Sequence, residues 1–263
     1  MQISLIITTY NRPAALEIVL KSVEIQSQLP YEVIIADDGS NEETHKLIEE
    51  FASKSKNNLI HSFQEDKGFR AARSRNKAIS IASGDYIIMI DGDMILHKEF
   101  IYDHFKNAQI GYFTQGSRVL LSDKRTREVL ENNKFVSNFL ETGLINRKNA
   151  IHSNILSKMF TINKNYLKGI KTCNVAFYKK DCLSVNGFNN EFEGWGKEDS
   201  EFFMRLMNKG INRKTLRFNA IQYHLWHQEV SRDSVLKNEL LLKKTINENL
   251  DWCKMGINQF YEY

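Results

Sequence analysis

The sequence is poor in cysteine and contains no long apolar run. Cys173, Cys182 and Cys253 are its three cysteines, and no two of them form a C-x-x-C pair. Their odd number and spacing argue against a disulfide framework and a zinc site, and reduced thiols fit the cytoplasm. No apolar run reaches the roughly 18 residues of a membrane-spanning helix, and no charged leader precedes the first apolar residues. We therefore expect a cytoplasmic protein that is neither secreted by an ordinary signal nor embedded in a membrane.

A strong excess of one charge is also missing. The chain carries 36 Lys and Arg against 32 Asp and Glu, a net charge of +4. This balance is too mild to indicate nucleic acid as a partner. Hydrophobic residues make up 42% and charged residues 26% of the 263 residues, a composition that is typical of a globular protein. The length allows one large domain or two small ones.

Strands and helices alternate through the first 120 residues. Short apolar runs predict strands at residues 3–7 and 32–36, and a third strand is expected at residues 59–63. Apolar residues at helical spacing follow each run, and Ser40 with Glu43 predicts a capping box at the second helix. This alternation predicts an α/β fold with a doubly wound, Rossmann-like, mostly parallel sheet. Ligands of such sheets bind at the carboxyl ends of the strands, so we expect the site in those loops.

Two carboxylates stand at the end of the most apolar strand. Asp91 and Asp93 follow the run of residues 86–90 and are separated by Gly92. Alternate residues of an extended segment can point the same way, and a glycine lets the backbone approach a ligand closely. Two such carboxylates suit a divalent cation that carries phosphate oxygens. The alternative interpretation is an ordinary Asp-Gly turn.

The neighbouring loops carry groups that suit a nucleotide. Tyr10 could stack on a base, and Thr8 and Asp38 could form hydrogen bonds with its edge. A basic cluster before the two carboxylates could supply counter-charge for a diphosphate, and it consists of Arg70, Arg73 and Arg75. Taken singly, Asp38 could instead form an Asx turn and the arginines a solvated helix face. Together with the two carboxylates, they favour a nucleotide site.

A second dense motif occupies residues 192–202. Gly194 and Gly196 flank Trp195 in a tight loop, and Glu198 and Asp199 fall in the first turn of an amphipathic helix. An aromatic face can stack on a sugar ring, and a carboxylate can abstract a proton from a hydroxyl. The alternative is that the two acids only complement the helix dipole.

The middle of the chain is basic. Residues 123–171 contain ten Lys and Arg against four Asp and Glu. Such a segment could screen donor phosphates, receive an anionic glycan or rest on an acidic membrane surface, and it could also be a solvated helical face. Residues 234–250 predict an amphipathic helix that covers the core or lies on a membrane. A peripheral contact with the inner face of the membrane therefore stays open.

Four motifs of the first half resemble glycosyltransferase family 2, whose members are inverting enzymes with the GT-A fold. They are I-I-T-T-Y-N-R-P at residues 6–13, D-D-G-S at 37–40, K-G-F-R-A-A-R at 67–73 and D-G-D at 91–93. The resemblance implies the following donor-side residues: Thr8, Tyr10 and Asp38 on the base, Asp91 on the ribose or sugar, and Arg12, Arg70 and Arg73 around the donor. It also implies that Asp93 ligates Mn²⁺ or Mg²⁺ on the donor diphosphate. Because residues 72–76 depart from the family pattern, it stays open which arginine meets phosphate.

The motif G-W-G-x-E-D at residues 194–199 is similar to one in β4-galactosyltransferases, polypeptide N-acetylgalactosaminyltransferases and bacterial chondroitin polymerases. The similarity implies that Asp199 is the general base and that Glu198 holds an acceptor hydroxyl or positions this base. Trp195 would lie where donor and acceptor meet, contacting both, and we also place Asn174 on the acceptor side. The similarity further implies His227 as a metal ligand, with His224 in reserve.

These observations predict one GT-A domain over residues 1–230, followed by a helical extension over residues 231–263. Residues 1–120 would form its nucleotide-sugar half and residues 172–230 its acceptor and catalytic half. The resemblance implies that a hexose or N-acetylhexosamine passes from a nucleotide sugar, most simply a UDP-sugar, to a glycan or a lipid-linked glycan. The product would be a surface polysaccharide such as a capsule or lipo-oligosaccharide.

Two other functions stay open. A sugar nucleotidyltransferase would need a glycine-rich phosphate loop near the N-terminus, and residues 9–14 contain no glycine. A non-catalytic glycan-binding module would need neither the two aspartates nor the Glu-Asp pair.

Overall fold

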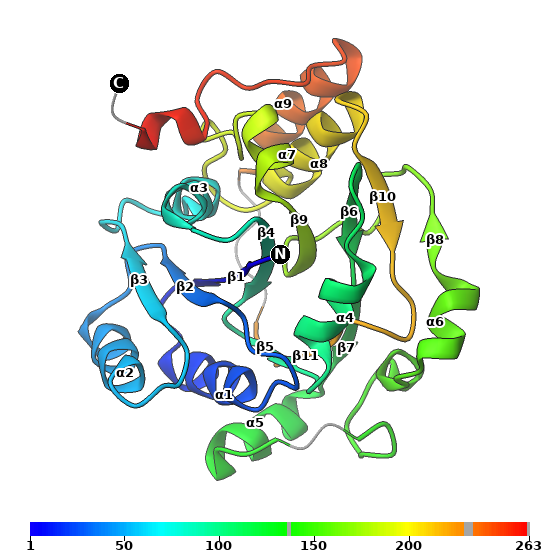
Figure 1. The fold of residues 1–263 in the computed structure, drawn as a ribbon. Coiled ribbons are helices and arrows are strands. Elements are labelled where there is room, and N and C mark those ends of the chain that lie inside the picture. The colour runs from blue at the N-terminus through cyan, green and yellow to red at the C-terminus, as the bar shows by residue number, and fades with distance from the viewer. Residues whose placement is uncertain (136–137, 229–233, 262–263) are drawn as a thin grey trace.

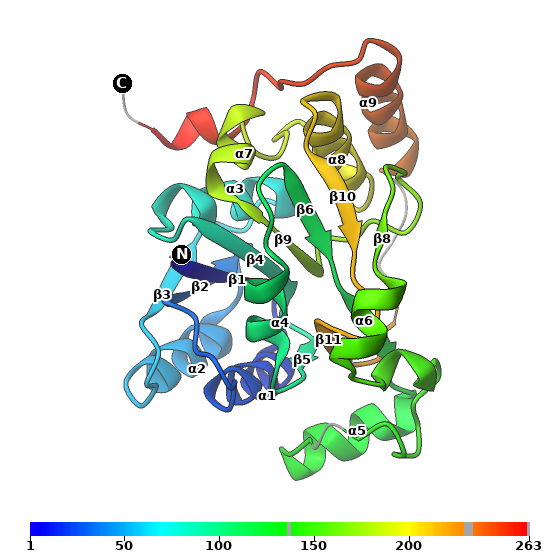
Figure 2. The ribbon, with the colours of Figure 1, turned by 45° about the vertical axis from the view of Figure 1, so that its right-hand side comes forward.

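The computed structural model describes residues 1–135, 138–228 and 234–261 (Figures 1 and 2). Within these residues, eight strands form a central sheet. In order across the sheet they are β3 (Leu59–Phe63), β2 (Glu32–Asp37), β1 (Ile3–Thr9), β4 (Tyr86–Asp91), β9 (Asn174–Tyr178), β6 (Tyr112–Gln115), β10 (Asn212–Thr215) and β8 (Ile162–Asn163). Strands β3, β2, β1 and β4 are parallel, and β9 is antiparallel to both of its neighbours. The predicted α/β class with a mostly parallel sheet is confirmed.

Helices cover both faces of this sheet. They are α1 (Pro13–Glu24), α2 (Glu42–Ala52), α3 (Ala71–Ile81), α4 (Phe100–Asn107), α5 (Asp123–Asn132), α6 (Asn154–Phe160), α7 (Lys179–Ser184), α8 (Glu198–Asn208) and α9 (Val235–Asn247), with the 3-10 helices η1 (Arg147–Ala150) and η2 (Ile257–Phe260). Figure 1 shows α1 and α2 on one side of the sheet and α3 and α8 on the other. Within β1, Leu5 and Ile7 pack toward α1, whereas Ile6 packs toward α3 and α8. This alternation gives the sheet two apolar faces, as a doubly wound fold requires.

Two predicted boundaries were wrong. Helix α2 begins after Asn41, whose side chain accepts a hydrogen bond from the Thr44 backbone N–H at 3.2 Å. Ser40 is not the cap, because its own N–H donates to the Asp37 carboxylate at 2.8 Å and its hydroxyl accepts from the Asn11 N–H. The run at residues 214–218 also predicts a strand, but β10 begins at residue 212 and ends at residue 215, where its pairing with β6 ends.

A second, three-stranded sheet joins distant segments. Strand β11 (Ile221–His224) pairs antiparallel with β5 (Met94–Leu96) and parallel with β7 (Ser117–Leu120). The register places His224 opposite Met94, and the Leu225 N–H donates to the Asp93 carbonyl oxygen at 3.0 Å. This small sheet therefore brings the segment after β10 back to the Asp-Gly-Asp loop.

The C-terminal part of the chain packs on α8. The Thr245 hydroxyl of α9 donates to the Glu201 carboxylate at 3.0 Å, and the Asn208 amide donates to the Leu250 carbonyl at 2.8 Å. The predicted boundary between residues 230 and 231 lies outside the described residues, so the division into domain and extension stays a prediction. Among the described helices, none combines the length and the apolar character that crossing a bilayer would take.

A buried ion pair fixes helix α8. The Arg205 side chain is fully buried, and its Nε and Nη2 donate to the Glu201 carboxylate at 2.7 and 2.8 Å. Its guanidinium also donates to the backbone carbonyls of Val185 and Gly187. The pair therefore ties the acceptor-side helix to the turn that follows α7.

We predict that Arg205→Met lowers the free energy of unfolding by about 3–5 kcal/mol, because the Glu201 carboxylate would stay buried without its cation. The matched control is Lys209→Met, which breaks a 2.7 Å pair with Asp251 whose side chains are 42% and 44% exposed. An exposed pair contributes at most about 1 kcal/mol. Urea unfolding followed by circular dichroism measures both variants, and equal losses would contradict the assigned role of Arg205.

Candidate active site

The sheet register brings the first and fourth strands to a common edge. Thr8 lies beside Asp91 across β1 and β4, and Thr9 lies beside Asp37 across β1 and β2. The Gly92 N–H donates to the Thr8 carbonyl at 2.7 Å. A Cβ atom at Gly92 would lie only 3.1 Å from the Thr9 hydroxyl and 3.2 Å from the Thr8 carbonyl oxygen. Glycine therefore allows the Asp-Gly-Asp loop to lie directly against the end of β1.

Asp93 faces two histidines and an arginine. Its Oδ2 atom lies 3.5 Å from His224 Nε2 and 3.4 Å from His227 Nε2, and Arg12 Nη1 donates to it at 2.6 Å. Burial raises the pKa of Asp93, but the hydrogen bond from His224 and the charges of His224, Arg12 and His227 outweigh it and lower the pKa overall. Asp93 is therefore an anion at neutral pH.

This group fits a divalent cation. One ligand atom from each of Asp93, His224 and His227 lies within 4.8 Å of the others, and Asp93 Oδ1 is buried without a hydrogen-bond partner. Magnesium takes nearly all of its ligands from oxygen, whereas imidazole nitrogen suits transition metals. The donor set therefore favours Mn²⁺ over Mg²⁺, and His224 lies as close to Asp93 as His227 does.

A second Asp-His-His group occurs among the described residues. Asp37, His45 and His61 also bring their ligand atoms within 4.8 Å of one another. Asp37 already accepts hydrogen bonds from the N–H groups of Gly39 and Ser40 and pairs with His61 at 2.9 Å. These bonds hold the turn after β2, so Asp93 is the better candidate for a metal ligand at the sheet edge.

Arg75 connects the two dense motifs of the sequence. Its side chain is only 6% exposed, and its guanidinium lies 3.0 Å from Glu198 Oε1 and 3.6 Å from Asp91 Oδ1. Burial raises the pKa of Asp91, the charge of Arg75 lowers it, and the charge of Asp93 raises it further, with a net rise. Arg75 was predicted in a phosphate-binding cluster, but the structure gives it two carboxylate partners. The sequence signal for a buried Arg75 was its helical spacing from Ala72 and Ile79, which are also buried.

The loop with Trp195 lies against the donor-side motifs. The Gly194 N–H donates to the Phe69 carbonyl at 2.9 Å, and the Asn238 amide of α9 donates to the Glu193 carbonyl at 3.2 Å. Gly194 and Gly196 have φ angles of 71° and 105°, a region that favours glycine. This backbone leaves Trp195 41% exposed at the surface of the loop.

Asp199 has the proton affinity of a base that works near neutral pH. Burial, followed by the negative charge of Glu198, raises the pKa of Asp199 to about 7, although Arg75 opposes this rise. Its Oδ1 atom accepts a hydrogen bond from the Ser200 N–H at 2.6 Å. A carboxylate with such a pKa can take a proton from a hydroxyl and release it again.

Asp38 is held by residues of the next motif. Its carboxylate accepts hydrogen bonds from the Gln64 amide and, at 2.8 Å, from the Arg70 backbone N–H. Gln64 also accepts from Arg73 at 2.9 Å, while the Arg70 guanidinium donates to the Glu65 carbonyl. Burial raises the pKa of Asp38 despite these bonds. Sequence reasoning did not identify Gln64, which links the second and third loops.

The residues after β1 lie in the same region. Thr8 Oγ1 is buried without a hydrogen-bond partner in the structure, and the Tyr10 hydroxyl donates to Asp66 at 3.0 Å. The Tyr10 ring is 46% exposed, so one face could receive a base. Arg12 pairs with Asp93, as described above, and so lies next to the candidate metal ligands.

The side-chain amide of Asn174 is engaged in hydrogen bonds within the protein. Its Oδ1 atom accepts from His104 at 3.0 Å, and its amide donates to the carbonyls of Ser117 and Ala220 at 2.9 and 2.8 Å. Burial lowers the pKa of His104 to about 4, so this imidazole stays neutral. The predicted acceptor contact of Asn174 gains no support from this arrangement, which joins β9 to the smaller sheet.

Two family descriptions match successive parts of the chain. Glycosyl transferase family 2 matches residues 4–171, and the N-terminal domain of galactosyltransferase matches residues 153–228. The first match covers more than half of the chain and includes the Asp-Gly-Asp loop, and the second covers the Glu-Asp helix. The chain belongs to glycosyltransferase family 2.

Curated relatives extend the similarity. The hyaluronan synthase of Pasteurella multocida is 29% identical over an alignment of 230 residues, and the match covers 81% of this chain and 24% of that protein. The chondroitin synthase of Escherichia coli is 27% identical over an alignment of 249 residues, and the match covers 84% of this chain and 34% of that protein. The chain therefore spans about a quarter to a third of the length of these relatives.

Solved structures share the fold. S. aureus TarS superposes with a TM-score of 0.64 at 20% identity, over 94% of this chain and 40% of that one. A structure of TarS 1–349 in complex with UDP-GlcNAc gives a TM-score of 0.60 at 18% identity, over 92% of this chain and 65% of that one. The predicted GT-A fold is thereby confirmed.

We predict that Asp93→Asn weakens Mn²⁺ binding by at least about 100-fold, the upper end of what even an outer-shell partner contributes. His227→Ala should weaken it as well, because it removes a nitrogen ligand. The matched control is His61→Gln, which changes the other Asp-His-His group. Water-proton relaxation during titration of the metal-free protein with Mn²⁺ measures the affinity. If His61→Gln loses Mn²⁺ binding and Asp93→Asn keeps it, the metal binds at the group around Asp37 instead.

Proposed function

We propose that the protein is a metal-dependent, inverting glycosyltransferase that moves a sugar from a UDP-sugar to a hydroxyl of a glycan acceptor. The observation that carries this proposal is the contact of Arg75 with both Asp91 and Glu198. One guanidinium thereby joins the donor-side loop to the acceptor-side helix. A nucleotide-binding or glycan-binding protein without transfer activity would not require these two motifs to meet.

The donor side uses the loops after β1, β2 and β4. We assign binding of the nucleotide base to Thr8, Tyr10 and Asp38, which lie in adjacent loops. Thr8 offers a buried hydroxyl without a hydrogen-bond partner in the structure, Tyr10 an exposed aromatic ring and Asp38 a buried carboxylate. Arg12, Arg70 and Arg73 supply positive charge around the diphosphate, and Asp91 faces the ribose or sugar. Asp93, His227 and His224 would hold the divalent cation, which when bound neutralises charge on the leaving diphosphate. The TarS complex with UDP-GlcNAc supports a UDP-linked donor.

The acceptor side uses the loop before α8 and its first turn. Asp199 removes the proton from the acceptor hydroxyl, and the oxygen then attacks the anomeric carbon from the face opposite the leaving diphosphate. This direct displacement inverts the anomeric carbon without a covalent enzyme intermediate. Trp195 stacks on a sugar ring, and Glu198, held by Arg75, orients the acceptor hydroxyl. Asn174 is left out of this assignment because its amide is engaged within the protein.

The class of product follows from the relatives. The hyaluronan and chondroitin synthases make it reasonable that this chain serves surface polysaccharide synthesis, with a hexose or an N-acetylhexosamine as the transferred sugar. A screen of UDP- and GDP-sugars for Mn²⁺-dependent turnover tests the donor. Donor hydrolysis with and without EDTA separates the transferase from a nucleotidyltransferase and from a glycan-binding module.

Asp199→Asn should lower kcat by about 10² to 10⁴-fold, the range for loss of a general base. Affinity for UDP should stay within about twofold, because Asp199 belongs to the acceptor side. Single-turnover transfer and UDP titration measure the two quantities. Full activity in this variant would remove Asp199 from the mechanism.

The pH profile gives a second test of the base. Because the pKa of Asp199 is raised to about 7, its reactive anion forms as the pH rises through neutrality. Activity should therefore fall about tenfold for each pH unit below 7. Glu198→Gln removes a negative neighbour that raises this pKa, so the rising limb should move to lower pH. If the rising part of the pH–activity profile stays in place or moves to higher pH in Glu198→Gln, the assignment of Asp199 as the base is contradicted.

A further inference from the structure

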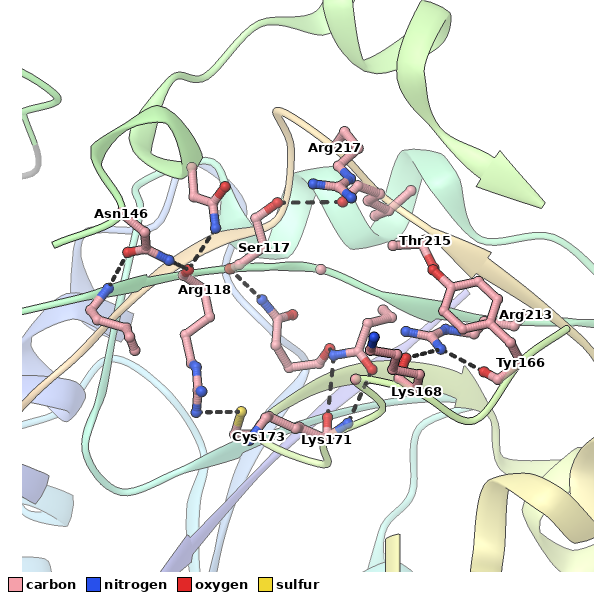
Figure 3. A pocket seen from close by; sticks show the side chains of 17 residues that line it. Ser117, Arg118, Asn146, Tyr166, Lys168, Lys171, Cys173, Arg213, Thr215 and Arg217 are labelled. Atoms are coloured by element: carbon pink, nitrogen blue, oxygen red, sulfur yellow. Dashed lines mark hydrogen bonds between the residues drawn. The ribbon is translucent and has the colours of Figure 1, made fainter. Parts of the chain in front are cut away.

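A basic cavity adjoins the candidate active site. Its volume is about 360 Å³, and strand β7, the start of β9, the end of β10 and residues 166–171 form its walls (Figure 3). Five basic residues line it, namely Arg118, Lys168, Lys171, Arg213 and Arg217. Among the described residues, no Asp or Glu lines it. A cavity with this charge selects anions.

The walls continue the strands that carry the active-site residues. Strand β9 pairs antiparallel with β4 with Asn174 opposite Ile90, so the residues before Asn174 run alongside the Asp-Gly-Asp loop. Strand β7 pairs with β11 with Leu120 beside His224, a candidate metal ligand. Part of the cavity wall therefore lies one strand away from the Asp-Gly-Asp loop and from His224.

Electrostatic effects agree with this placement. The charge of Lys171 lowers the pKa of Asp199, against the larger effects of burial and Glu198. Burial first, and then the charge of Asp91, raises the pKa of Cys173 to about 12, so this thiol in the cavity wall is neutral. The charge of one cavity residue, Lys171, therefore acts on the proposed base.

The basic groups of the cavity form no ion pairs with carboxylates in the part of the chain that the structure describes. Within residues 1–135, 138–228 and 234–261, none of the five basic side chains has a carboxylate within 4.0 Å, whereas Arg12, Arg75 and Arg205 all do. Arg118 points toward Cys173, and the contact of its Nη1 atom with the sulfur measures 4.0 Å (Figure 3). Sulfur is a weak acceptor, so the guanidinium keeps its capacity for an oxyanion.

The cavity is also built rigidly. The Asn146 and Asn149 amides donate to the Arg118 carbonyl at 2.9 and 3.0 Å, which fixes this part of β7. Arg213 is buried, donates to the carbonyls of Tyr166 and Lys168 and stacks on the Tyr166 ring at 4.3 Å. Its charge is therefore held in the wall, while Arg118 is presented to the interior.

We propose that this cavity binds an oxyanion of the acceptor glycan, beside the hydroxyl that Asp199 deprotonates. The group would be the carboxylate of a uronic acid residue or a phosphate on the glycan, since either accepts two parallel hydrogen bonds from a guanidinium. The proposal rests on the proposed glycosyltransferase function and narrows its acceptor to an acidic glycan.

Binding without turnover tests the cavity itself. The probes are a uronate-ended oligosaccharide, the same oligosaccharide with its carboxylate reduced to an alcohol, and a glycan phosphate. Calorimetry should show at least tenfold tighter binding of one or both acidic probes than of the neutral one. The stronger acidic probe identifies the source of the oxyanion. Equal binding of the neutral probe, or binding of neither acidic probe, would overturn the proposal.

Variants then locate the binding. Arg118→Gln should weaken binding of the preferred acidic probe by about 10- to 100-fold, as expected for loss of a charge-assisted hydrogen bond. Its affinity for the neutral probe should stay within about twofold of wild type. Lys171→Met gives an independent second test of the cavity. Lys124→Met, which removes an exposed charge from α5 outside the cavity, is the matched control. An equal loss for Lys124→Met and Arg118→Gln would reduce the effect to general surface charge and overturn the assignment.

Donor chemistry is measured separately. Mn²⁺-dependent hydrolysis of the UDP-sugar without acceptor reports the proposed function and should be unchanged in Arg118→Gln. If wild-type protein hydrolyses the donor but does not distinguish acidic from neutral acceptors, only the cavity proposal fails. If it binds the acidic probe but never hydrolyses a donor, the transferase proposal fails and the binding assignment stands.

Discussion

The candidate site depends on one buried guanidinium. Arg75 pairs with Asp91 and Glu198, and burial would otherwise drive Asp91 and the neighbouring Asp199 further toward their protonated forms. Its charge lowers the pKa of Asp91 and of Asp199, while burial and neighbouring acids raise both. Two loops that are remote along the chain are therefore held together by ion pairs.

Much of the fold could be predicted because its signals are local. Strands β1, β2 and β4 are short apolar runs that are buried along nearly their whole length, and helical spacing follows β1 and β2. The loops after them carry recognisable motifs, so Thr8, Asp38, Asp91 and Asp93 were predicted for one edge of a sheet. The register of β1 with β2 and β4 brings these loops together.

The remaining features depend on contacts that no local pattern encodes. Ser40 was predicted to cap α2, but its backbone N–H donates to the Asp37 carboxylate. Asn41 caps the helix instead, by accepting a hydrogen bond from the Thr44 N–H. Arg75 was one of three arginines predicted to supply counter-charge for a diphosphate. In the structure, its place on α3 brings it to Asp91 and Glu198 instead. The amide of Asn174 is engaged by three partners from other segments. Each outcome was decided by tertiary neighbours, which sequence spacing does not reveal.

The pairing of β11 with β5 has a consequence for how the protein matures. His224 reaches the aspartate loop only when a strand from the last fifth of the chain docks beside one from the first half. A nascent chain can complete the sheet of β1 to β4 well before that strand is synthesised. The group of Asp93, His224 and His227 is therefore completed only after β11 has docked, so a chain that lacks β11 would fold in part without bringing both histidines to Asp93.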